Sequence, residues 1–328
     1  MRRTKLLSVT LAAVAAAFAV ATHPASAQDY PNRNITIVVP FAAGGPTDGV
    51  ARQIAAALQA KFGQSVVVEN VSGAGSTIGT TRVARAAPDG YTLLVHNLAI
   101  SANPSLYPKL AFDPEKDLTP VGFINYQPLI LGARKSLPAN TLPELADWLK
   151  ANIGRFATPG TGSTGHLTSA LFAQALGVKI DYIPYRGGAP ALQDLVAGHV
   201  DFFFGTPQQL LEPIKTDMIK AYGVTSRERM EQLPDLPSFV QQFGPKLEIL
   251  FWHAMFAPAG TPKPVIDKLN AALQEFMSDP EIVKGWSIIG VSPYPKEKRS
   301  PEAGKELMHS EIVRWGEVIR ANNIQPQN

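Results

Sequence analysis

The sequence predicts an α/β protein with two lobes and a ligand cleft between them. Signals for short apolar strands and for amphipathic helices alternate along most of the chain. About 300 residues follow an N-terminal leader, which is too many for one compact core and suits two lobes. Two extended apolar passages, at residues 118–133 and 250–257, interrupt the alternation. We interpret these passages as the places where the chain crosses between the lobes.

The first lobe is expected to open with a strand, a glycine turn and a helix. The strand covers residues 35–39, the turn is Gly44–Gly45, and Pro46 starts the helix. The pattern continues with strands at residues 65–69 and 91–95 and a helix near residues 77–86. This β-α-β-α-β order predicts a parallel sheet with helices on both faces. A proline-rich stretch, residues 103–114, is expected to be irregular.

A second α/β series begins at Thr141–Glu144, where Thr-Leu-Pro-Glu is a capping box that starts a helix. The expected strands are residues 155–157, 180–183, 200–204 and 220–224, and the expected helices are residues 141–152, 166–176, 189–197 and 208–216. Three last helices start where a polar residue precedes a proline, at residues 261–262, 279–280 and 300–301. We expect lobe 1 to comprise residues 28–125 and 254–328, and lobe 2 to comprise residues 126–253.

The first 27 residues have the features of a cleaved export signal. Arg2, Arg3 and Lys5 precede an apolar, Ala-rich segment at residues 6–20, and Ala25–Ala27 is a small-x-small cleavage site. An uncleaved anchor is the alternative, but the apolar segment is too short to span a bilayer comfortably. An ordinary secretory signal is favoured over a twin-arginine signal. We predict cleavage after Ala27 and a periplasmic protein.

The charge balance does not indicate a nucleic-acid partner. The chain has 30 Lys and Arg against 27 Asp and Glu, and the leader holds three of the basic residues and none of the acidic ones. The mature chain is therefore near neutral. It contains no block of five like charges and no interleaving of aromatic and basic residues. We expect a protein without a nucleic-acid partner and, by default, a monomer.

The sequence contains no set of residues typical of catalysis or metal binding. Because cysteine is absent, there is no disulfide, no thiolate nucleophile and no cysteine metal site. None of the six histidines is paired at HxxxH or HExxH spacing. A Gly-x-Ser-x-Gly nucleophile elbow is also absent. We expect no enzyme activity, no metal and no cofactor.

Four glycine-rich turns follow predicted strands. They are Gly44–Gly45, Gly73–Thr77, Gly160–Gly165 and Gly187–Gly188. A single turn of this kind is more often an ordinary strand-to-helix turn that needs positive φ. Two such turns, one per lobe and each opening a helix, favour an anion site, because free N–H groups and the positive helix end point into the turn. We expect these turns to hold a carboxylate beyond the carboxyl ends of the strands.

Four side chains near the turns have both a binding and a structural interpretation. His166 could donate to a carboxylate or pack locally, and both interpretations remain open. Asp48 could meet a ligand amine, although complementing its own helix N-terminus is slightly favoured. Arg186 could bind a ligand carboxylate or form a surface pair with Asp194, and the surface pair is at least as well supported. Asp201 precedes an aromatic run that is more typical of core than of a site.

The third turn also matches a dinucleotide-binding fingerprint, Gly160-x-Gly162-x-x-Gly165. It follows a predicted strand and opens a helix, and Asp181 lies about 20 residues further on, where a ribose-binding acid would be. However, an exported protein meets little free nicotinamide cofactor, and Pro159 stands directly before the motif. A nicotinamide-dependent oxidoreductase therefore remains a minor alternative.

Several longer motifs extend over nearly all of the mature chain. They are YPNRNITIVVPFAAGGPTDGVAR (residues 30–52), VVVENVSGAGSTIGTTRVARAAPDGYTLL (66–94), GTGSTGHLTSALF (160–172), IPYRGGAPALQDLVAGHVDFFF (183–204), LPDLPSF (233–239) and FAPAGTPKPVIDKLNAAL (256–273). In these motifs the sequence resembles the Bug-type solute-binding receptors of tripartite tricarboxylate transporters. The resemblance covers residues 30 to about 319, and the order of separate motifs makes it specific.

The resemblance implies a two-lobed type II periplasmic binding protein fold that closes on a small carboxylate. It also implies that backbone N–H groups and hydroxyls of two turns, residues 41–48 and 160–166, hold the carboxylate with little arginine pairing. The candidate ligand-binding residues are Phe41, Ala43, Gly44, Gly45, Thr47, Asp48, Ser76, Gly162, Ser163, Thr164, Gly165, His166, Arg186, Gly187 and Asp201. Residues 156–158 and Thr161 depart from the usual pattern, so dicarboxylates, amino acids and aromatic acids all remain candidate ligands.

We therefore expect an exported receptor that captures a small carboxylate and delivers it to the integral-membrane permease subunits of the transporter. Lobe closure is expected to be a hinge motion about the crossings near Ile124–Pro128 and Leu250–Ala254. A receptor that presents its closed form to a membrane sensor kinase is an alternative that the sequence does not separate from transport. Replacing Gly162 or Gly165 by a β-branched residue is expected to abolish binding without unfolding the protein.

Overall fold

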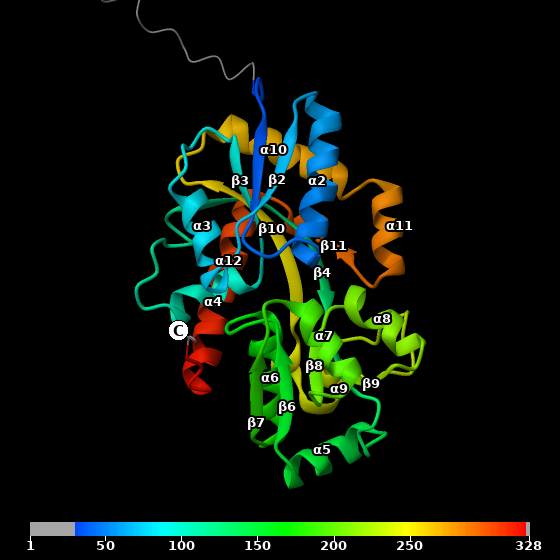
Figure 1. Ribbon diagram of the computed structural model, residues 1–328. Coiled ribbons are helices and arrows are strands. Elements are labelled where there is room, and N and C mark those ends of the chain that lie inside the picture. Colours follow the sequence, from blue (N-terminus) through cyan, green and yellow to red (C-terminus); the bar gives the residue numbers. More distant parts are fainter. Residues whose placement is uncertain (1–29, 326–328) are drawn as a thin grey trace, which may run out of the picture. The chain divides into compact units, whose positions relative to one another are not determined.

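Two β-sheets form the framework of the computed structural model, which describes residues 30–325 (Figure 1). Among these residues, a six-stranded sheet has the order β11-β4-β10-β3-β1-β2 and a five-stranded sheet has the order β7-β6-β8-β5-β9. Arg33 begins the compact unit that contains both sheets. The predicted export signal, residues 1–27, lies outside the described residues.

The first sheet combines strands from both ends of the chain. Its strands are β1 (Ile35–Val39), β2 (Val66–Asn70), β3 (Thr92–Asn97), β4 (Leu118–Pro128), β10 (Leu250–Pro258) and β11 (Ser292–Pro293). β1 runs parallel to both β2 and β3, whereas β10 runs antiparallel to β3 and β4. The predicted parallel arrangement of the first three strands is therefore confirmed.

Helices from both halves of the chain pack on the first sheet. They are α2 (Pro46–Phe62), α3 (Thr77–Ala84), α4 (Ala99–Leu106), α10 (Lys263–Phe276), α11 (Pro280–Ile288) and α12 (Pro301–Ala321), with short 3-10 turns at Ala74–Ser76 and Lys296–Lys298. α2 packs beside α10, and α12 packs on α4 and β4. The apolar stripe of α2, Val50, Ile54 and Leu58, is buried as its helical spacing predicts.

The second sheet has a parallel part and an antiparallel part. Its strands are β5 (Ile130–Arg134), β6 (Gly154–Thr158), β7 (Ile180–Pro184), β8 (Phe202–Gly205) and β9 (Ile219–Val224). Its helices are α5 (Leu142–Ala151), α6 (Thr164–Leu176), α7 (Gly188–Ala197), α8 (Pro207–Lys215) and α9 (Phe239–Phe243), and a 3-10 turn covers Pro245–Leu247. β6 is parallel to β7 and β8, and β5 is antiparallel to β8 and β9.

The aromatic run in β8 belongs to the core, as its composition predicts. Phe202 and Phe203 are fully buried and Phe204 is nearly so. Because side chains alternate along a strand, Phe202 and Phe204 join one apolar cluster with Phe156, whereas Phe203 joins a separate one with Leu195. Both faces of the second sheet are therefore covered.

β4 and β10 connect the two sheets. They pair antiparallel along their length, with Leu250 opposite Pro128 and Pro258 opposite Leu118. Figure 1 shows β10 running from the first sheet toward the second. The pairing continues past the predicted boundaries at residues 125/126 and 253/254, and the division into lobes stays a prediction. The extended passages predicted at residues 118–133 and 250–257 are thus present, the first as β4 and most of β5 and the second as β10.

The expectation of an irregular stretch at residues 103–114 is wrong for its first part. α4 covers Ala99–Leu106 and includes Pro104. Pro104 lies near the end of this short helix, so its missing N–H removes only one hydrogen bond. The first turn is stabilised by burial of Ile100 and Ala102 and by the side-chain oxygen of Asn97, which accepts from the N–H of Ala99 at 3.0 Å.

Candidate functional site

The glycine turns lie at the carboxyl ends of strands in both sheets. In the first sheet, β1 leads into Gly44–Gly45 and α2, and β3 ends at Asn97, before α4. In the second sheet, β6 leads into residues 159–163 and α6. β4 brings these two edges together, because Ile130, just past its end, pairs with Gly205 at the end of β8. Ligands of open α/β sheets bind at such edges.

The N-terminus of α2 carries no side-chain cap, and two residues of its first turn are buried. Gly45 is the N-cap residue, Pro46 is the first helical residue, and no side chain accepts from the N–H groups of the first turn. Thr47 and Asp48 are each 3% exposed. Their backbone N–H groups are among the donors that a helix start leaves without an intrahelical partner. Together with the helix dipole, these donors suit a small anion.

The carboxylate of Asp48 holds this turn in place. It accepts hydrogen bonds from the N–H of Gly44 (2.9 Å), Nε of Arg52 (3.0 Å) and Nδ2 of Asn70 (3.0 Å). Burial alone would raise the pKa of Asp48, but these hydrogen bonds outweigh burial and the pKa is lowered. Both carboxylate oxygens are thus engaged within the protein, which favours the structural interpretation of Asp48.

A buried polar cluster surrounds Ser76, which adopts the left-handed conformation (φ 78°). Its hydroxyl is hydrogen-bonded to Nε2 of His96 (3.0 Å) and accepts from Nδ2 of Asn103 (3.3 Å). Burial lowers the pKa of His96 to about 3, so the ring is neutral. The ring of Phe41 packs edge-on against His96, with the ring centroids 5.1 Å apart. His96 therefore connects Ser76 with Phe41, two predicted site residues.

His166 closes the turn that precedes α6. The N–H of Gly162 donates to Nδ1 of His166 (3.1 Å), and Oγ of Ser163 caps α6 by accepting from the N–H of His166 (3.4 Å). Burial lowers the pKa of His166 to about 4, so the ring is neutral. Because Nδ1 accepts, the ring proton is on Nε2. The ring packs edge-on against Tyr182 with centroids 4.4 Å apart. His166 therefore packs locally, as one of its two interpretations predicts, and its Nε2–H is still a donor for a ligand.

The first turn of α6 offers further donors. Thr164 is 4% exposed, and its hydroxyl has no hydrogen-bond partner among the described residues. The N–H groups of Thr164 and Gly165 are in the first turn, where intrahelical partners are lacking. A Cβ atom on Gly165 would lie 3.0 Å from the carbonyl oxygen of Phe204 and 3.1 Å from Cδ of Pro159. The close packing of Gly165 fixes the position of these donors.

Asp201 does not join the turns. It precedes β8, and its N–H donates to the carbonyl of Arg155 at the start of β6. Since β6 and β8 are parallel, this is the opposite edge of the sheet from Gly162. The carboxylate accepts from Nε of Arg134 (2.8 Å) and from the N–H (2.9 Å) and Nε (3.2 Å) of Arg155. The structure therefore gives Asp201 a structural role in place of the expected ligand contact.

Arg186 and Gly187 lie after β7, at the same edge as the Gly160 turn. Arg186 is exposed and makes no hydrogen bond or ion pair with another described residue. The expected surface pair with Asp194 is not formed. Asp194 instead accepts from the hydroxyl of Tyr185 (2.6 Å) and contacts Nδ1 of His199 (3.3 Å). Arg186 is thus available near the edge that carries the turns.

Four polar residues near these edges were not identified from the sequence. Nδ2 of Asn97 donates to Oγ1 of Thr47 (2.9 Å) at the start of α2. Nδ1 of His253 is hydrogen-bonded to Oδ1 of Asn125 (2.7 Å), and Gln127 lies two residues further along β4. The one sequence signal that could have identified them is a polar residue inside an otherwise apolar extended run.

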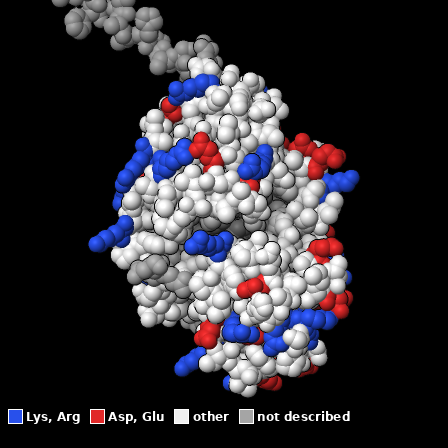
Figure 2. Space-filling view, viewed as in Figure 1, with Lys and Arg blue, Asp and Glu red and all other residues white. Residues whose placement is uncertain are grey.

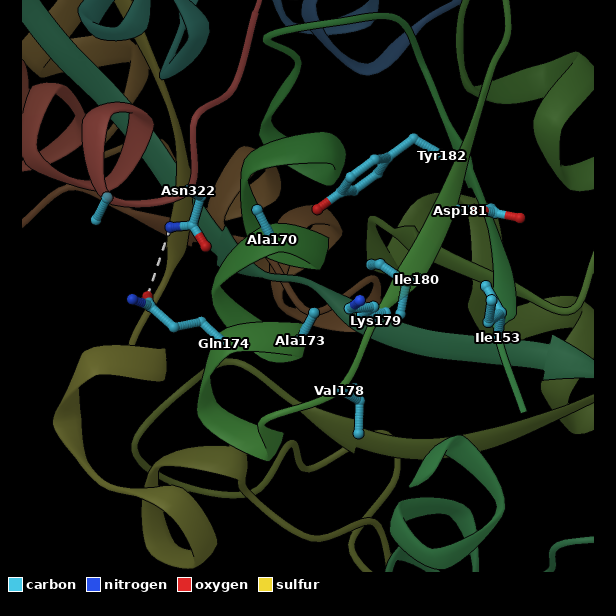
Figure 3. A pocket seen from close by; sticks show the side chains of 11 residues that line it. Ile153, Ala170, Ala173, Gln174, Val178, Lys179, Ile180, Asp181, Tyr182 and Asn322 are labelled. Carbon is cyan, nitrogen blue, oxygen red and sulfur yellow. Dashed lines mark hydrogen bonds between the residues drawn. The ribbon is translucent and has the colours of Figure 1, made fainter. Parts of the chain in front are cut away.

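The structure also contains a cavity of about 420 Å³ away from the turns, between α6, β7 and the end of α12 (Figure 3). Figure 3 shows Tyr182 and Asp181 pointing to opposite sides of β7, and Nδ2 of Asn322 donates to Oε1 of Gln174 at 3.5 Å.

Asp181 pairs with Arg155 at the start of β6. A ribose-binding acid would have to lie at the other end, near the glycine turn, so the geometry does not support a dinucleotide site.

Charges of both signs are mixed on the face of the molecule shown in Figure 2. No group of three or more His, Cys, Asp or Glu side chains suited to a metal ion occurs among the described residues. Within residues 30–325, no helix has the length and apolar character needed to cross a membrane.

Comparisons with known proteins agree with this architecture. A family model described as "Tripartite tricarboxylate transporter family receptor" matches residues 50–324. The chain is 35% identical over 324 residues to Protein BugT of Bordetella pertussis, covering 98% of each chain. It is similar to the solved structure of the periplasmic binding protein BugD, with 39% identity, a TM-score of 0.84 and coverage of 91% of this chain and 100% of BugD.

A second similar structure was solved with a ligand. It is MatC from Rhodopseudomonas palustris with bound malate, which shares 38% identity and a TM-score of 0.82 and covers 88% of this chain and 100% of MatC. The family match covers most of the chain, and the α/β architecture of two sheets joined by β4 and β10 has close counterparts among solved periplasmic binding proteins. The chain belongs to the tripartite tricarboxylate transporter receptor family and has the periplasmic binding protein fold.

Proposed function

We propose that this protein captures a small carboxylate between the turns at Gly44–Asp48 and Gly160–His166 and delivers it to a membrane permease. The observation that carries the proposal is the pair of helix N-termini at the carboxyl edges of the two sheets, each with buried residues in its first turn. α2 has no side-chain cap, and α6 leaves the N–H groups of its first two residues without a partner. Two such helix ends favour one small anion.

The chemistry of the donors supports a carboxylate. A carboxylate only accepts hydrogen bonds, and the turns offer backbone N–H groups, the hydroxyl of Thr164 and the Nε2–H of His166. These groups are held by the internal hydrogen bonds of Asp48 and His166, so little ordering remains to be done on binding. The bound malate of MatC supports the same ligand class, and dicarboxylates are the first ligands to test.

We infer that the two sheets are the cores of two lobes, residues 28–125 with 254–328 and residues 126–253. In this proposal β4 and β10 act as the hinge. Gly162 packs closely on Leu106, since a Cβ atom on Gly162 would lie 2.3 Å from Cδ1 of Leu106, and this contact is broken when the lobes open. The donors named above include no nucleophile paired with a general base, so we propose a receptor rather than an enzyme. Export with cleavage after Ala27 would bring the protein to the periplasm. We propose that it acts there as a monomer.

A thermal-shift screen of the mature protein, starting at Gln28, tests the proposal. The panel contains mono-, di- and aromatic carboxylates, together with NAD and NADP. A ligand at about 100 times its Kd adds roughly 2.7 kcal/mol to the free energy of unfolding, which raises the Tm measurably. The expected result is stabilisation by at least one carboxylate and none by the nucleotides.

The matched control for each active compound is its uncharged amide. An amide keeps the shape of the carboxylate but removes the charge that the two helix ends stabilise, so it should not shift the Tm. Equal stabilisation by acid and amide, or stabilisation by nucleotides alone, contradicts the proposal.

A further inference from the structure

Three polar residues are directly opposite one another across β3, β10 and β4. His253 pairs with Asn97 on one side and with Asn125 on the other. Gln127 lies two residues after Asn125 and therefore on the same face of β4. Asn97 in turn donates to the hydroxyl of Thr47 at the start of α2 (2.9 Å). A continuous polar row thus runs from the first turn of α2 across the sheet to Gln127.

The polar atoms at the end of this row are buried without partners. His253, Asn125 and Gln127 are at most 1% exposed. Four of their atoms have no hydrogen-bond partner among the described residues: Nε2 of His253, Nδ2 of Asn125, and Nε2 and Oε1 of Gln127. A buried polar group without a partner destabilises a protein. Such a group is typical of a binding site whose occupant supplies the missing hydrogen bonds.

The row lies between the two edges that carry the glycine turns. Asn125 and His253 are level with Asn97, the last residue of β3. Three residues after Gln127, Ile130 pairs with Gly205 at the end of β8. Gln127 is therefore on the segment that spans the carboxyl edges of both sheets, where a ligand held by both turns would lie.

The donors and acceptors of the row are mixed and uncharged. Nδ1 of His253 is bonded to an amide oxygen, which can only accept, so Nδ1 carries the ring proton. Burial lowers the pKa of His253 to about 3, so the ring is neutral and Nε2 is an acceptor. The amide of Asn125 adds a donor, and Gln127 adds one donor group and one acceptor. A carboxylate would leave the acceptors unsatisfied, and an ammonium group would leave the donors unsatisfied.

We propose that Asn125, Gln127 and His253 form a neutral subsite that binds a hydroxyl group of the carboxylate ligand. A hydroxyl both donates and accepts, so it can bond to an amide N–H and to Nε2 of His253 or Oε1 of Gln127. This proposal rests on the proposed function, because the carboxylate of the same ligand is held by the turns. It names the ligand class more closely, as hydroxy acids.

Affinity measurements with matched ligand pairs test the subsite. Each pair differs by one hydroxyl: malate and succinate, lactate and propionate, and 4-hydroxybenzoate and benzoate. Titration calorimetry on the unmodified mature protein should give a Kd at least about tenfold lower for the hydroxylated member of one pair, because a site built to bond a hydroxyl leaves its polar groups unpaired with the other. Equal binding of the two members in every pair overturns the subsite and leaves the proposed function standing.

Substitution of Gln127 links the preference to these residues. Gln127→Leu keeps a similar volume and removes two of the unpaired atoms, so the preference for the hydroxylated member should fall to below about threefold. The control is Asn270→Leu on α10, which packs on the first sheet. Nδ2 of Asn270 donates to the carbonyls of Val121 and Arg299, and its Oδ1 accepts from Gln274. This control should lower the Tm and leave the preference unchanged.

Two further outcomes would also overturn the subsite. A hydroxyl preference that Gln127→Leu retains overturns the subsite and indicates that the row holds an internal water. If no member of any pair binds, and no other carboxylate in the thermal-shift screen binds, both the subsite and the proposed function are overturned.

Discussion

Gly162 and Leu106 pack together so closely that a Cβ atom on Gly162 would lie 2.3 Å from Cδ1 of Leu106. Gly162 belongs to the turn after β6, in the second sheet, and Leu106 ends α4, which packs with the first sheet. Gly162 also has a φ of +75°, a conformation that favours glycine. This contact makes the second turn sensitive to any added side chain.

Replacing Gly162 by alanine should therefore abolish or greatly weaken carboxylate binding. The positive φ alone should lower the free energy of unfolding by about 1–2 kcal/mol, and the contact with Leu106 adds to this effect. The matched control is Gly177→Ala at the end of α6, where φ is +65° but no atom lies within 4 Å of the added Cβ. Both variants should lose stability in denaturant titrations, but only Gly162→Ala should lose affinity in calorimetry.

A double variant identifies the cause of this loss. Leu106→Ala in the Gly162→Ala background removes the atom that collides with the new Cβ, so part of the affinity should return. A Gly162→Ala variant with unchanged affinity would exclude this turn from the binding site.

Stability between pH 6.5 and 4 should depend on His166. Burial lowers the pKa of His166 from 6.5 to about 4 in the folded protein. Below pH 6.5 the unfolded chain takes up a proton that the folded chain does not yet bind. The free energy of unfolding therefore decreases as the pH is lowered. This one group accounts for about 3 kcal/mol between these pH values, and its effect fades to nothing within about one pH unit above them. Urea titrations at several pH values measure the dependence.

The comparison that isolates His166 uses His166→Asn. Asparagine can still accept from the N–H of Gly162 but does not titrate. Burial also lowers the pKa values of His96 and His253 to about 3, so both residues likewise make the protein less stable as the pH is lowered. The variant should therefore reduce the loss of stability at low pH without abolishing it. An unchanged pH dependence would show that His166 is not held neutral in the folded protein.

The turn before α2 should depend on the charge of Asp48. Asp48→Asn keeps one acceptor but removes the ion pair with Arg52 and weakens the bonds from Gly44 and Asn70, so it should lower the free energy of unfolding by about 1–2 kcal/mol. Because the pKa of Asp48 is lowered in the folded state, its contribution is present above the unfolded value of 3.8 and is lost as the pH falls through the folded value.

The control for Asp48 is Asp267→Asn. Asp267 forms an exposed pair with Lys263 on α10, and exposed pairs of this kind contribute little to stability. Thermal melts at pH 7 should therefore separate the two variants. Equal melting temperatures would mean that the hydrogen bonds to Asp48 do not hold the turn.

Features set by short stretches of chain were predictable from the sequence. The helix predicted at Thr141–Glu144 is present, and Oγ1 of Thr141 caps it by accepting from the N–H of Glu144 at 3.3 Å. The second bond of the expected capping box differs, because the carboxylate of Glu144 accepts from the N–H of Asn140 (2.7 Å) and not from that of Thr141. The turn at Gly44–Gly45 opens a helix at Pro46 as expected. In each case neighbouring residues supply the stabilising contacts, so a local pattern carries enough information.

Features that depend on distant pairing were not predictable. Asn125 and His253 are 128 residues apart in the sequence, and only the pairing of β4 with β10 makes them neighbours. Gln127 has no local signal beyond being polar in an apolar run. The position of Asp201 depends in the same way on the register of β6 with β8, which places its carboxylate beside Arg155.

Asp201 provides the clearest separation between structural and binding roles. Asp201→Asn removes the charge that Arg134 and Arg155 neutralise, so it should lower the free energy of unfolding by about 1–3 kcal/mol. Because Asp201 lies at the opposite edge of the second sheet from Gly162, the Kd for the best carboxylate should not change. Calorimetry below the melting range of the variant measures this Kd, and urea titration measures the stability. A higher Kd in a variant that remains folded would mean that Asp201 contributes to ligand binding, which would contradict the assignment made from the strand register.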